Sequence, residues 1–359
     1  MADNYLISGI QQMGIGIPRV YEAWEFYRKT FGMDIAMFDE AAEANLMLPY
    51  TGGEPRERHA VLAINLQGGG GMEIWQYTSR TPQPADFEAR LGDFGLYICK
   101  MKSQDVRATY AEFQQKGVAL LGGVTTTPEG KEHFFCKDPY GNLFEVVPST
   151  DWFQPNDRFT TGGVFGCTIG VSDLDRARKL YSDILGYDTV VYDQTDSFDD
   201  LSVLPGGSDP VRRVLLSHSQ PRQGAFSQML GSSEIELVQL TGERKGVSIF
   251  KDRMWGDLGF IHLCFDIRDM DALRRACASA GFPFTVDSAA DRPVFDMGEA
   301  AGNFSYIEDP DGTLIEFVET HKIPLVKKIG WYLNLNNRNP KKPLPKWMLK
   351  TLGLNRTKD

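Results

Sequence analysis

The segment DPYGNLFE at residues 138–145 returns as DPDGTLIE at residues 309–316. In both copies Asp and Pro suit the first positions of a turn, Gly suits its exit, and the following apolar residues read as a strand with one embedded Glu. A second pair of segments, FYRKTFGM at 26–33 and LYSDILGY at 180–187, recurs in the same order. The chain therefore consists of two related halves, and a candidate site in one half can be compared with the same positions in the other.

Each half divides again into two smaller units. Residues 8–35 predict a strand, then a helix that ends at Gly32, because glycine accepts the left-handed conformation that closes helices. Segments 94–120, 164–190 and 259–285 repeat this order, and strand-like runs follow each of them. The repeating unit is therefore β-α-β-β-β, and it occurs four times.

Composition sets the domain organisation. With 359 residues and 42% hydrophobic content, the chain has enough apolar material for two cores of ordinary size. A stretch rich in Pro, Gly and polar residues separates the halves. The predicted division is an N-terminal domain at 1–150 (modules one and two), a linker at 151–163, a C-terminal domain at 164–320 (modules three and four) and a basic tail with a short helix at 321–359.

Charge is unevenly distributed along the chain. The net charge is −10, yet the segment from His321 onward holds ten Lys or Arg and one acid, Asp359. An acidic body would repel phosphate groups, so we expect no nucleic-acid partner. The tail could pack on the body, pack on a partner subunit or touch an anionic membrane; we favour packing, because Trp347 and Leu349 are most simply buried.

The sequence also predicts a cellular compartment. No run approaches the ~18 apolar residues of a membrane span, and the N-terminus lacks a secretory signal. Five scattered cysteines without a Cys-x-x-Cys pair suit a reduced environment. We expect a cytoplasmic protein with no integral membrane segment and a small-molecule substrate, and a homodimer is left open.

The order of these motifs resembles the vicinal oxygen chelate superfamily, which includes glyoxalase I, bleomycin-resistance proteins and extradiol dioxygenases. The resemblance covers roughly residues 8–148 and 164–320. It implies an α+β fold in which four βαβββ modules pair into two open, cupped mixed sheets. It also implies that metal ligands project into a cup from the first and last strands of each module.

In the C-terminal half, the resemblance places Glu236, His262 and Glu316 at ligand positions, while Gly166 occupies the fourth. Imidazole and carboxylates together suit Zn²⁺, Ni²⁺, Mn²⁺ or Fe²⁺. Three protein ligands with an open position are typical of a catalytic metal site. We therefore expect one divalent ion held by Glu236, His262 and Glu316.

In the N-terminal half, the equivalent positions hold Gln12, Glu73 and Glu145, and Ile98 (or Gly95) replaces the histidine. Two carboxylates and an amide without imidazole make a weaker transition-metal site. We expect this half to be structural, and whether its polar set binds anything is left open.

Three functions remain from the sequence. The first is a metal-dependent isomerase or lyase of glyoxalase type, in which Glu316 or Glu236 moves a proton of a small oxygen-chelating substrate. The second is an extradiol-type ring-cleaving dioxygenase. The resemblance to those enzymes implies an iron site with two histidines and one carboxylate, and Gly166 at the position of the first-strand histidine disfavours this function. The third is a binding or resistance protein of the bleomycin type that carries out no reaction.

Overall fold

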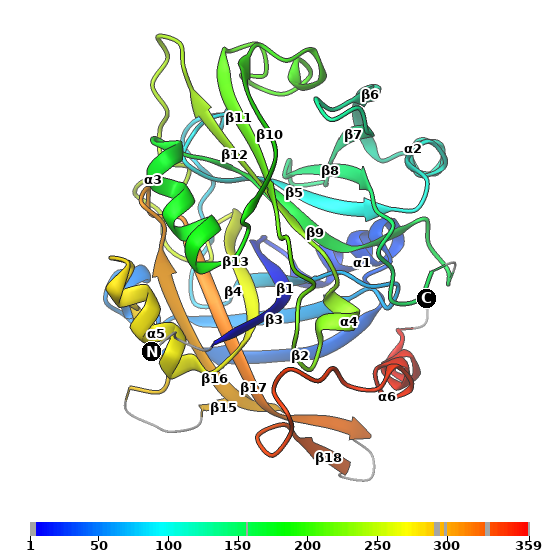
Figure 1. Ribbon diagram of the computed structural model, residues 1–359, viewed down its shortest axis with the longest axis vertical. Coiled ribbons are helices and arrows are strands. Elements are labelled where there is room, and N and C mark those ends of the chain that lie inside the picture. The colour runs from blue at the N-terminus through cyan, green and yellow to red at the C-terminus, as the bar shows by residue number, and fades with distance from the viewer. Residues whose placement is uncertain (1–4, 156, 291–294, 298–299, 327–330, 358–359) are drawn as a thin grey trace.

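Two mixed β-sheets form the body of the computed structural model (Figure 1). It describes residues 5–357 except 156, 291–294, 298–299 and 327–330. Four successive modules of one strand, one helix and further strands build the sheets. The predicted α+β fold with four βαβββ modules in two open mixed sheets is therefore confirmed.

The first two modules have the expected order. Module one comprises β1 (Leu6–Gly16), α1 (Val20–Phe31), β2 (Ile35–Glu43), the 3-10 turn η1 (Leu48–Tyr50), β3 (Glu57–Ile64) and β4 (Gly71–Tyr77). Module two comprises β5 (Gly95–Ser103), α2 (Val106–Gln115), β6 (Ala119–Thr126), β7 (Glu132–Lys137) and β8 (Leu143–Pro148).

The last two modules carry additions. Module three comprises β9 (Thr161–Gly170), α3 (Leu174–Arg178), the π-helical turn η2 (Lys179–Ile184), β10 (Thr189–Asp196), η3 (Asp199–Leu201), β11 (Val211–Ser217), α4 (Ser227–Leu230) and β12 (Glu234–Leu240). Module four and the tail comprise β13 (Gly259–Arg268), α5 (Met270–Ser279), β14 (Val286–Asp287), β15 (Phe295–Met297), β16 (Ala300–Glu308), β17 (Leu314–Val326), β18 (Trp331–Asn334), α6 (Lys346–Lys350) and η5 (Thr351–Asn355).

The sheets join modules that are not consecutive in the sequence. In the larger sheet the strand order is β14-β16-β17-β13-β1-β4-β3-β2, which unites module four with module one. In the smaller sheet the order is β10-β11-β12-β9-β5-β8-β7-β6, which unites module three with module two. The sequence division placed modules one and two in one domain and three and four in another. The sheets divide differently, because β1 hydrogen-bonds antiparallel to β13 and β5 does so to β9.

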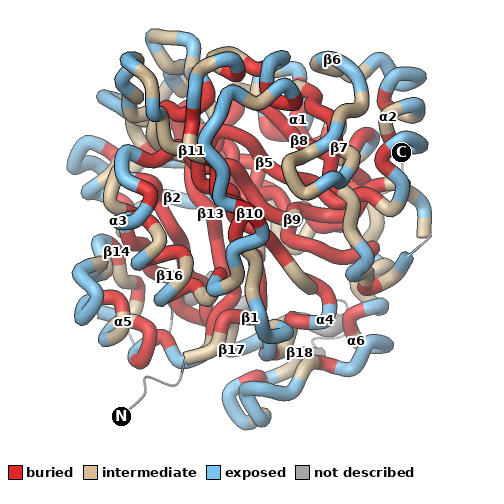
Figure 2. Tube along the Cα trace, turned by 45° about the horizontal axis from the view of Figure 1, so that its top comes forward, coloured by how far each residue is buried: buried red, intermediate tan, exposed pale blue. Residues whose placement is uncertain are grey.

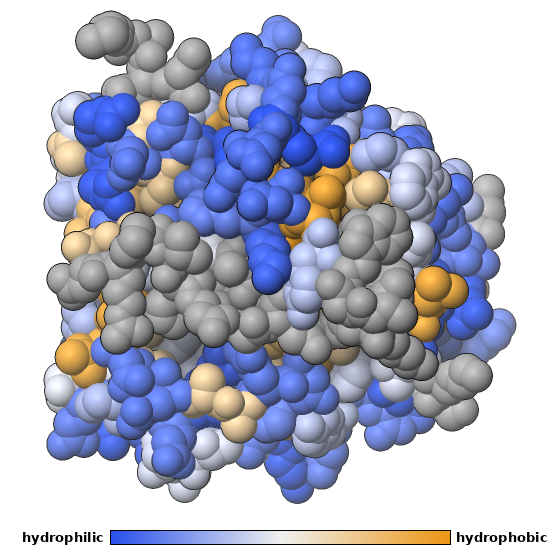
Figure 3. All heavy atoms as spheres, turned by 90° about the horizontal axis from the view of Figure 1, so that it is seen from below, coloured by the Kyte–Doolittle hydropathy of each residue, from blue (hydrophilic) through white to orange (hydrophobic). Residues whose placement is uncertain are grey.

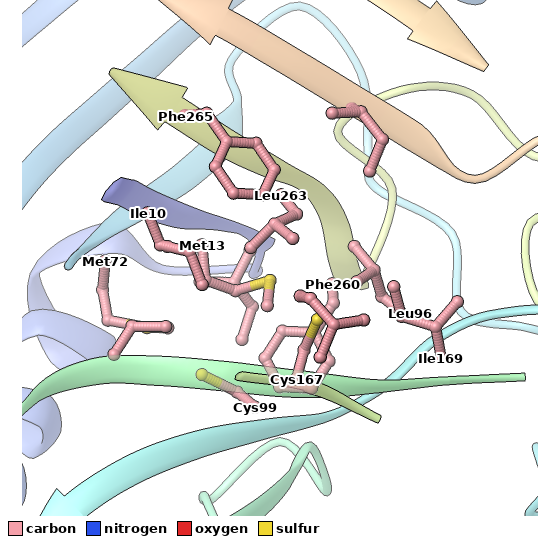
Figure 4. Packing of buried hydrophobic residues seen from close by; sticks show 14 of the residues in the cluster. Ile10, Met13, Met72, Leu96, Cys99, Cys167, Ile169, Phe260, Leu263 and Phe265 are labelled. Atoms are coloured by element: carbon pink, nitrogen blue, oxygen red, sulfur yellow. The ribbon is translucent and has the colours of Figure 1, made fainter. Parts of the chain in front are cut away.

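Alternation along the central strands separates a core face from a cup face. Met13 on β1, Cys99 on β5, Cys167 on β9 and Leu263 on β13 belong to one large buried cluster between the sheets (Figure 4). Because side chains alternate across a strand, the residues before and after each of these point away from that cluster. These opposite faces are the cups. Figure 2 shows the central strands buried and the outer strand β10 largely exposed.

Aspartates begin three of the helices. The side chains of Asp105, Asp173 and Asp269 accept hydrogen bonds from backbone N–H groups three residues later, at α2, α3 and α5. These bonds satisfy donors that have no partner inside the helix. Helix α1 ends at Gly32, whose φ of 67° lies in the left-handed region.

The C-terminal segment packs on the larger sheet beside β2 and β3. Leu344 and Leu349 are buried in a cluster that also contains Ile35 and Ile64. The expectation for Trp347 was wrong, because its side chain is 60% exposed. The guanidinium of Arg356 reaches Asp34, with Nη1 2.7 Å from Oδ2. Strand β17 runs from 314 to 326, so the sheet continues across the predicted boundary at 320.

The face seen from below is mainly hydrophilic, with scattered hydrophobic residues (Figure 3). Within the described part of the chain, no helix combines the length and apolarity that crossing a membrane requires.

The pairing of distant modules predicts how the chain behaves when it is divided. We expect residues 1–155 and 156–359, produced separately, to be poorly soluble, because each piece exposes open edges at β1 and β5 or at β9 and β13. Co-expression with a tag on one piece should recover a one-to-one complex with the circular dichroism spectrum of the intact chain. A soluble, cooperatively unfolding monomer of either piece alone would contradict this expectation.

Candidate metal centre

Glu73 and His262 face each other across a glycine on the cup face of the larger sheet. In the strand register, Gly14 on β1 lies opposite His262 on β13 and opposite Glu73 on β4. A Cβ built on Gly14 would lie 2.3 Å from Cε1 of His262, which is far inside van der Waals contact. The absence of a side chain at Gly14 is therefore what lets the imidazole lie over β1 toward Glu73.

Gln12 and Glu316 lie in the neighbouring row of the same sheet. Gln12 on β1 is opposite Cys264 on β13, and Cys264 is opposite Glu316 on β17. Residues two apart in a strand share a face, so this row projects on the same side as Glu73 and His262. Four strands from the first and last modules thus bring four polar side chains to one point.

The functional groups of these residues are within contact distance. His262 Nε2 lies 3.1 Å from Glu316 Oε2 and 3.2 Å from Glu73 Oε2. Gln12 Nε2 donates to Glu73 Oε2 at 3.0 Å and lies 3.4 Å from Glu316 Oε2. All four side chains are buried. The arrangement concentrates two carboxylates and one imidazole at the floor of the cup.

The electrostatics of this cluster favour a positive charge. Burial opposes protonation of the imidazole, but Glu316 and then Glu73 outweigh it and raise the pKa of His262 to about 10. The carboxylates are thus placed to share a cation between them.

The residues fit a divalent metal ion. One ligand atom from each of Glu73, His262 and Glu316 lies within 4.8 Å of the others. His262 Nε2 lies within ion-pair distance of both carboxylates, whereas His262 Nδ1 and Gln12 Oε1 are buried and have no hydrogen-bond partner among the described residues. Buried polar atoms without a partner are costly in a protein interior. Imidazole, carboxylate and amide oxygen are a donor set that first-row divalent metals accept.

Aromatic rings enclose the histidine. Trp255 stacks on His262 with ring centroids 6.2 Å apart and planes 14° apart, and Tyr306 meets it edge-on at 5.6 Å. Above the polar floor, the cup holds a cavity of about 720 Å³ that Gln12, Glu73 and Glu316 line. A metal ion at the floor would therefore face a space large enough for a small-molecule ligand.

The second cup, on the smaller sheet, has carboxylates at the equivalent positions but different residues around them. In its register, Glu236 is opposite Thr168, which is opposite Ile98, while Lys100 is opposite both Gly166 and Glu145. Glu236 and Glu145 thus correspond to Glu73 and Glu316. Ile98 replaces the histidine, Gly166 replaces the glutamine, and Lys100 stands where the first cup has Cys264.

The ammonium group of Lys100 fills the centre of the second cup. Nζ lies 2.9 Å from Glu236 Oε2, 3.0 Å from Glu234 Oε1 and 3.3 Å from Glu145 Oε2. Burial opposes its charge, but Glu145, Glu236 and Glu234 together raise the pKa of Lys100 well above its usual value. The lysine therefore stays charged and neutralises the carboxylates from within the chain.

Two further cations complete this network. Arg213 pairs with Glu236, and its Nη1 lies 2.6 Å from Asp200 Oδ2. His133 Nδ1 lies 2.6 Å from Glu145 Oε1; burial opposes its charge, but Asp200 and Glu145 raise the pKa of His133 to about 9. The second cup is thus a closed ionic cluster of buried side chains.

The three residues predicted to bind one metal ion, Glu236, His262 and Glu316, do not lie in one cup. His262 and Glu316 lie together, but Glu236 lies in the other sheet, where it binds Lys100 and Arg213. Glu73 takes the position that Glu236 was expected to fill. The polar set of the N-terminal half is also divided, because Gln12 and Glu73 join the first cup and Glu145 joins the second. Both corrections follow from the pairing of β1 with β13.

Comparisons with known proteins agree with this architecture. Residues 9–146 and 167–297 each match a family model described as the glyoxalase/bleomycin resistance protein/dioxygenase superfamily. The chain belongs to this superfamily. A search of curated proteins found no match.

Solved structures with the same fold include two of similar overall size. Glyoxalase I from Zea mays has a TM-score of 0.53 at 13% identity, with 88% of this chain and 92% of that chain covered. A candidate dioxygenase from Bacillus subtilis subsp. subtilis str. 168 has a TM-score of 0.53 at 15% identity, with coverages of 88% and 86%. At these identities the likeness concerns the fold of the superfamily alone.

A sequence signal could have distinguished the two cups. The residues around Glu236 and those around Glu73 both form an apolar strand with one embedded Glu, so these strands do not distinguish the cups. Lys100, however, is a charged residue in the middle of an apolar strand, at an alternation position that faces a cup. A buried lysine needs carboxylate partners. That requirement marks this cup as an ion cluster, while the identity of its carboxylates follows from the pairing of β5 with β8 and β9.

Removing the central cation of the second cup should be costly. We expect Lys100→Met to lower the free energy of unfolding by about 3–5 kcal/mol, because three buried carboxylates lose their shared partner. Urea denaturation measures this change. The control is Lys29→Met, which removes a surface ion pair with Glu25 and should change stability by less than about 0.5 kcal/mol. Equal effects of the two substitutions would show that Lys100 does not neutralise the cup.

The space over Gly14 makes a second test. We expect Gly14→Ala to displace the His262 ring and to weaken Co²⁺ binding by about 10–100-fold, as loss of a positioning contact does at metal sites. Visible absorption of bound Co²⁺ reports the affinity. Gly123→Ala is the control, since nothing lies within 4 Å of its added Cβ. Unchanged Co²⁺ affinity in Gly14→Ala would contradict the role given to this glycine.

Proposed function

We propose that the cup of the larger sheet binds one divalent metal ion through Glu73, His262 and Glu316, with Gln12 beside them. The observation that supports the proposal is the convergence of these buried groups, in which His262 Nε2 lies within 3.2 Å of an oxygen of each carboxylate. Zn²⁺, Ni²⁺, Mn²⁺ and Fe²⁺ all suit this donor set. The ion is expected at about one per chain, because the second cup holds Lys100 instead.

We further propose an isomerase or lyase reaction of glyoxalase type on a small substrate with two adjacent oxygens. A bound divalent ion would polarise a carbonyl oxygen and stabilise the negative charge that develops when the neighbouring carbon loses a proton. Glu316 is the proposed base, and Glu73 is the carboxylate across the site from it. Each carboxylate has two oxygens, so one can hold an ion while the other accepts a proton.

The donor set favours this redox-neutral reaction over ring cleavage. The cluster contains a single imidazole, and an amide, Gln12, occupies the first-strand position that a second histidine would need. A function limited to ligand binding does not explain why two carboxylates and a histidine are buried at the floor of the cup, where each of them costs solvation energy.

Metal content is the direct test. Protein purified without a chelating tag should retain about one divalent ion per chain by mass spectrometry of the metals. His262→Ala should lose it and keep its fold. His59→Ala is the matched control, because His59 lies outside the cup, paired with Asp39, and should leave the metal content unchanged. Full occupancy in His262→Ala would refute the assignment.

Proton transfer can be tested with a simple probe. The metal-loaded protein should accelerate exchange of the α-protons of 2-hydroxyacetophenone with D₂O, followed by proton NMR. Glu316→Gln should slow this exchange by at least about 100-fold, because an amide cannot accept the proton. If Glu316→Gln retains the exchange rate and Glu73→Gln loses it, Glu73 is the base.

A further inference from the structure

The cavity above the proposed metal site has walls that select for apolar ligands. Its floor is polar, but its sides come from β2, β3, α4, β16 and β17 and are dominated by aliphatic and aromatic side chains. Four methionines also line the cavity: Met37, Met47, Met229 and Met348. Methionine is flexible and polarisable and makes favourable contacts with aromatic rings. The indole groups of Trp75 and Trp255 add flat surfaces near the floor.

Charge in the cavity disfavours an anionic ligand. Among the described residues that line it, Arg58 is the only basic one. Its guanidinium is already engaged, with Nη1 donating to the Glu40 carbonyl at 3.0 Å and Nη2 3.2 Å from Glu40 Oε1. The lining also includes the carboxylates of Glu43 and Asp287. A carboxylate, sulfonate or phosphate that lay against the walls, away from the metal ion, would therefore lose its hydration without gaining a cationic partner.

The C-terminal segment supplies one wall. Met348, Leu349 and Leu352 line the cavity from α6 and η5. The segment is fixed in place: the Leu344 N–H donates to the Ala225 carbonyl at 2.8 Å, and Arg356 pairs with Asp34. The basic tail therefore contributes apolar side chains to the cup, while its lysines at 346 and 350 lie outside the lining.

We propose that the ligand of this cup is a largely apolar molecule without an anionic group, aromatic in its body, which carries two adjacent oxygens at the end that reaches the floor. The proposal rests on the function proposed above, because the metal ion would receive those oxygens. The apolar, cation-poor walls carry the rest of the argument. The residues of the C-terminal segment that line the cavity set this selectivity together with the methionines.

Two dyes that differ by one charge test the proposal. Naphthalene-2,3-diol is uncharged, and 6,7-dihydroxynaphthalene-2-sulfonate has the same two hydroxyls and ring with an added anion. Titrated into the Zn²⁺-loaded protein and followed by naphthalene fluorescence, the diol should bind at least tenfold more tightly than the sulfonate. Equal or tighter binding of the sulfonate, or no binding of either dye, would overturn the proposal.

Two variants test whether residues that line the cup determine the preference for the diol. Leu352→Lys adds a cation to the lining and should reduce the preference for the diol at least fivefold. Leu354→Lys adds the same charge on the same segment, but Leu354 is 82% exposed and lies outside the lining, so the preference should not change. A loss of preference in Leu354→Lys equal to that in Leu352→Lys would place the selectivity outside the cup and overturn the proposal.

His262→Ala separates this proposal from the metal site. Without the imidazole, both dyes should bind more weakly by the same factor, and the preference for the diol should remain. If His262→Ala leaves the binding of both dyes unchanged and the diol is still preferred, the metal assignment fails while the ligand class stands. If the preference itself disappears in His262→Ala, the walls do not select the ligand and the proposal is overturned.

Discussion

The antiparallel pairing of β1 with β13 is the contact on which the rest of the molecule depends. It sets Gly14 against His262 and Gln12 against Cys264, and the parallel partners β4 and β17 then add Glu73 and Glu316 on either side. If β1 slipped by one residue, Gln12 would turn toward the core and Gly14 would no longer lie opposite His262. The proposed metal site therefore forms only when modules one and four pair in the larger sheet, because each module supplies part of it.

The two cups show two ways to neutralise the same pair of buried carboxylates. In the first, Glu73 and Glu316 converge on an imidazole, and Gly14 leaves the space that this ring needs. In the second, Glu145 and Glu236 surround a lysine that reaches in from β5. The first arrangement leaves ligand atoms and a cavity open to a small molecule. The second satisfies its charges internally, so an external cation would have to displace a covalently attached one.

Local patterns in the sequence were enough to predict the modules, the end of the first helix at Gly32, and the strands that carry His262 and Glu316. Turn chemistry and alternation are encoded within a few residues, and the internal repeat supports each of them twice. Which module pairs with which other module cannot be read from such local patterns. Hydrogen-bond pairing between β1 and β13 depends on packing across the whole chain. Because of the internal repeat, Glu73 and Glu236 occupy the same position in their modules, and the sequence pattern cannot tell which of them joins His262. The ligand set therefore needed the structure, although Lys100 marked the second cup as different.

The smaller sheet is drawn from one continuous stretch, residues 95–240, whereas the larger sheet takes its strands from both sides of that stretch. During synthesis all strands of the smaller sheet leave the ribosome before β13 emerges from it. The first strand made must wait for one of the last, with its edge unpaired, until residues beyond 259 emerge. The ion cluster around Lys100 can thus form on an unfinished chain, and the site around His262 is assembled only when Glu316 has left the ribosome.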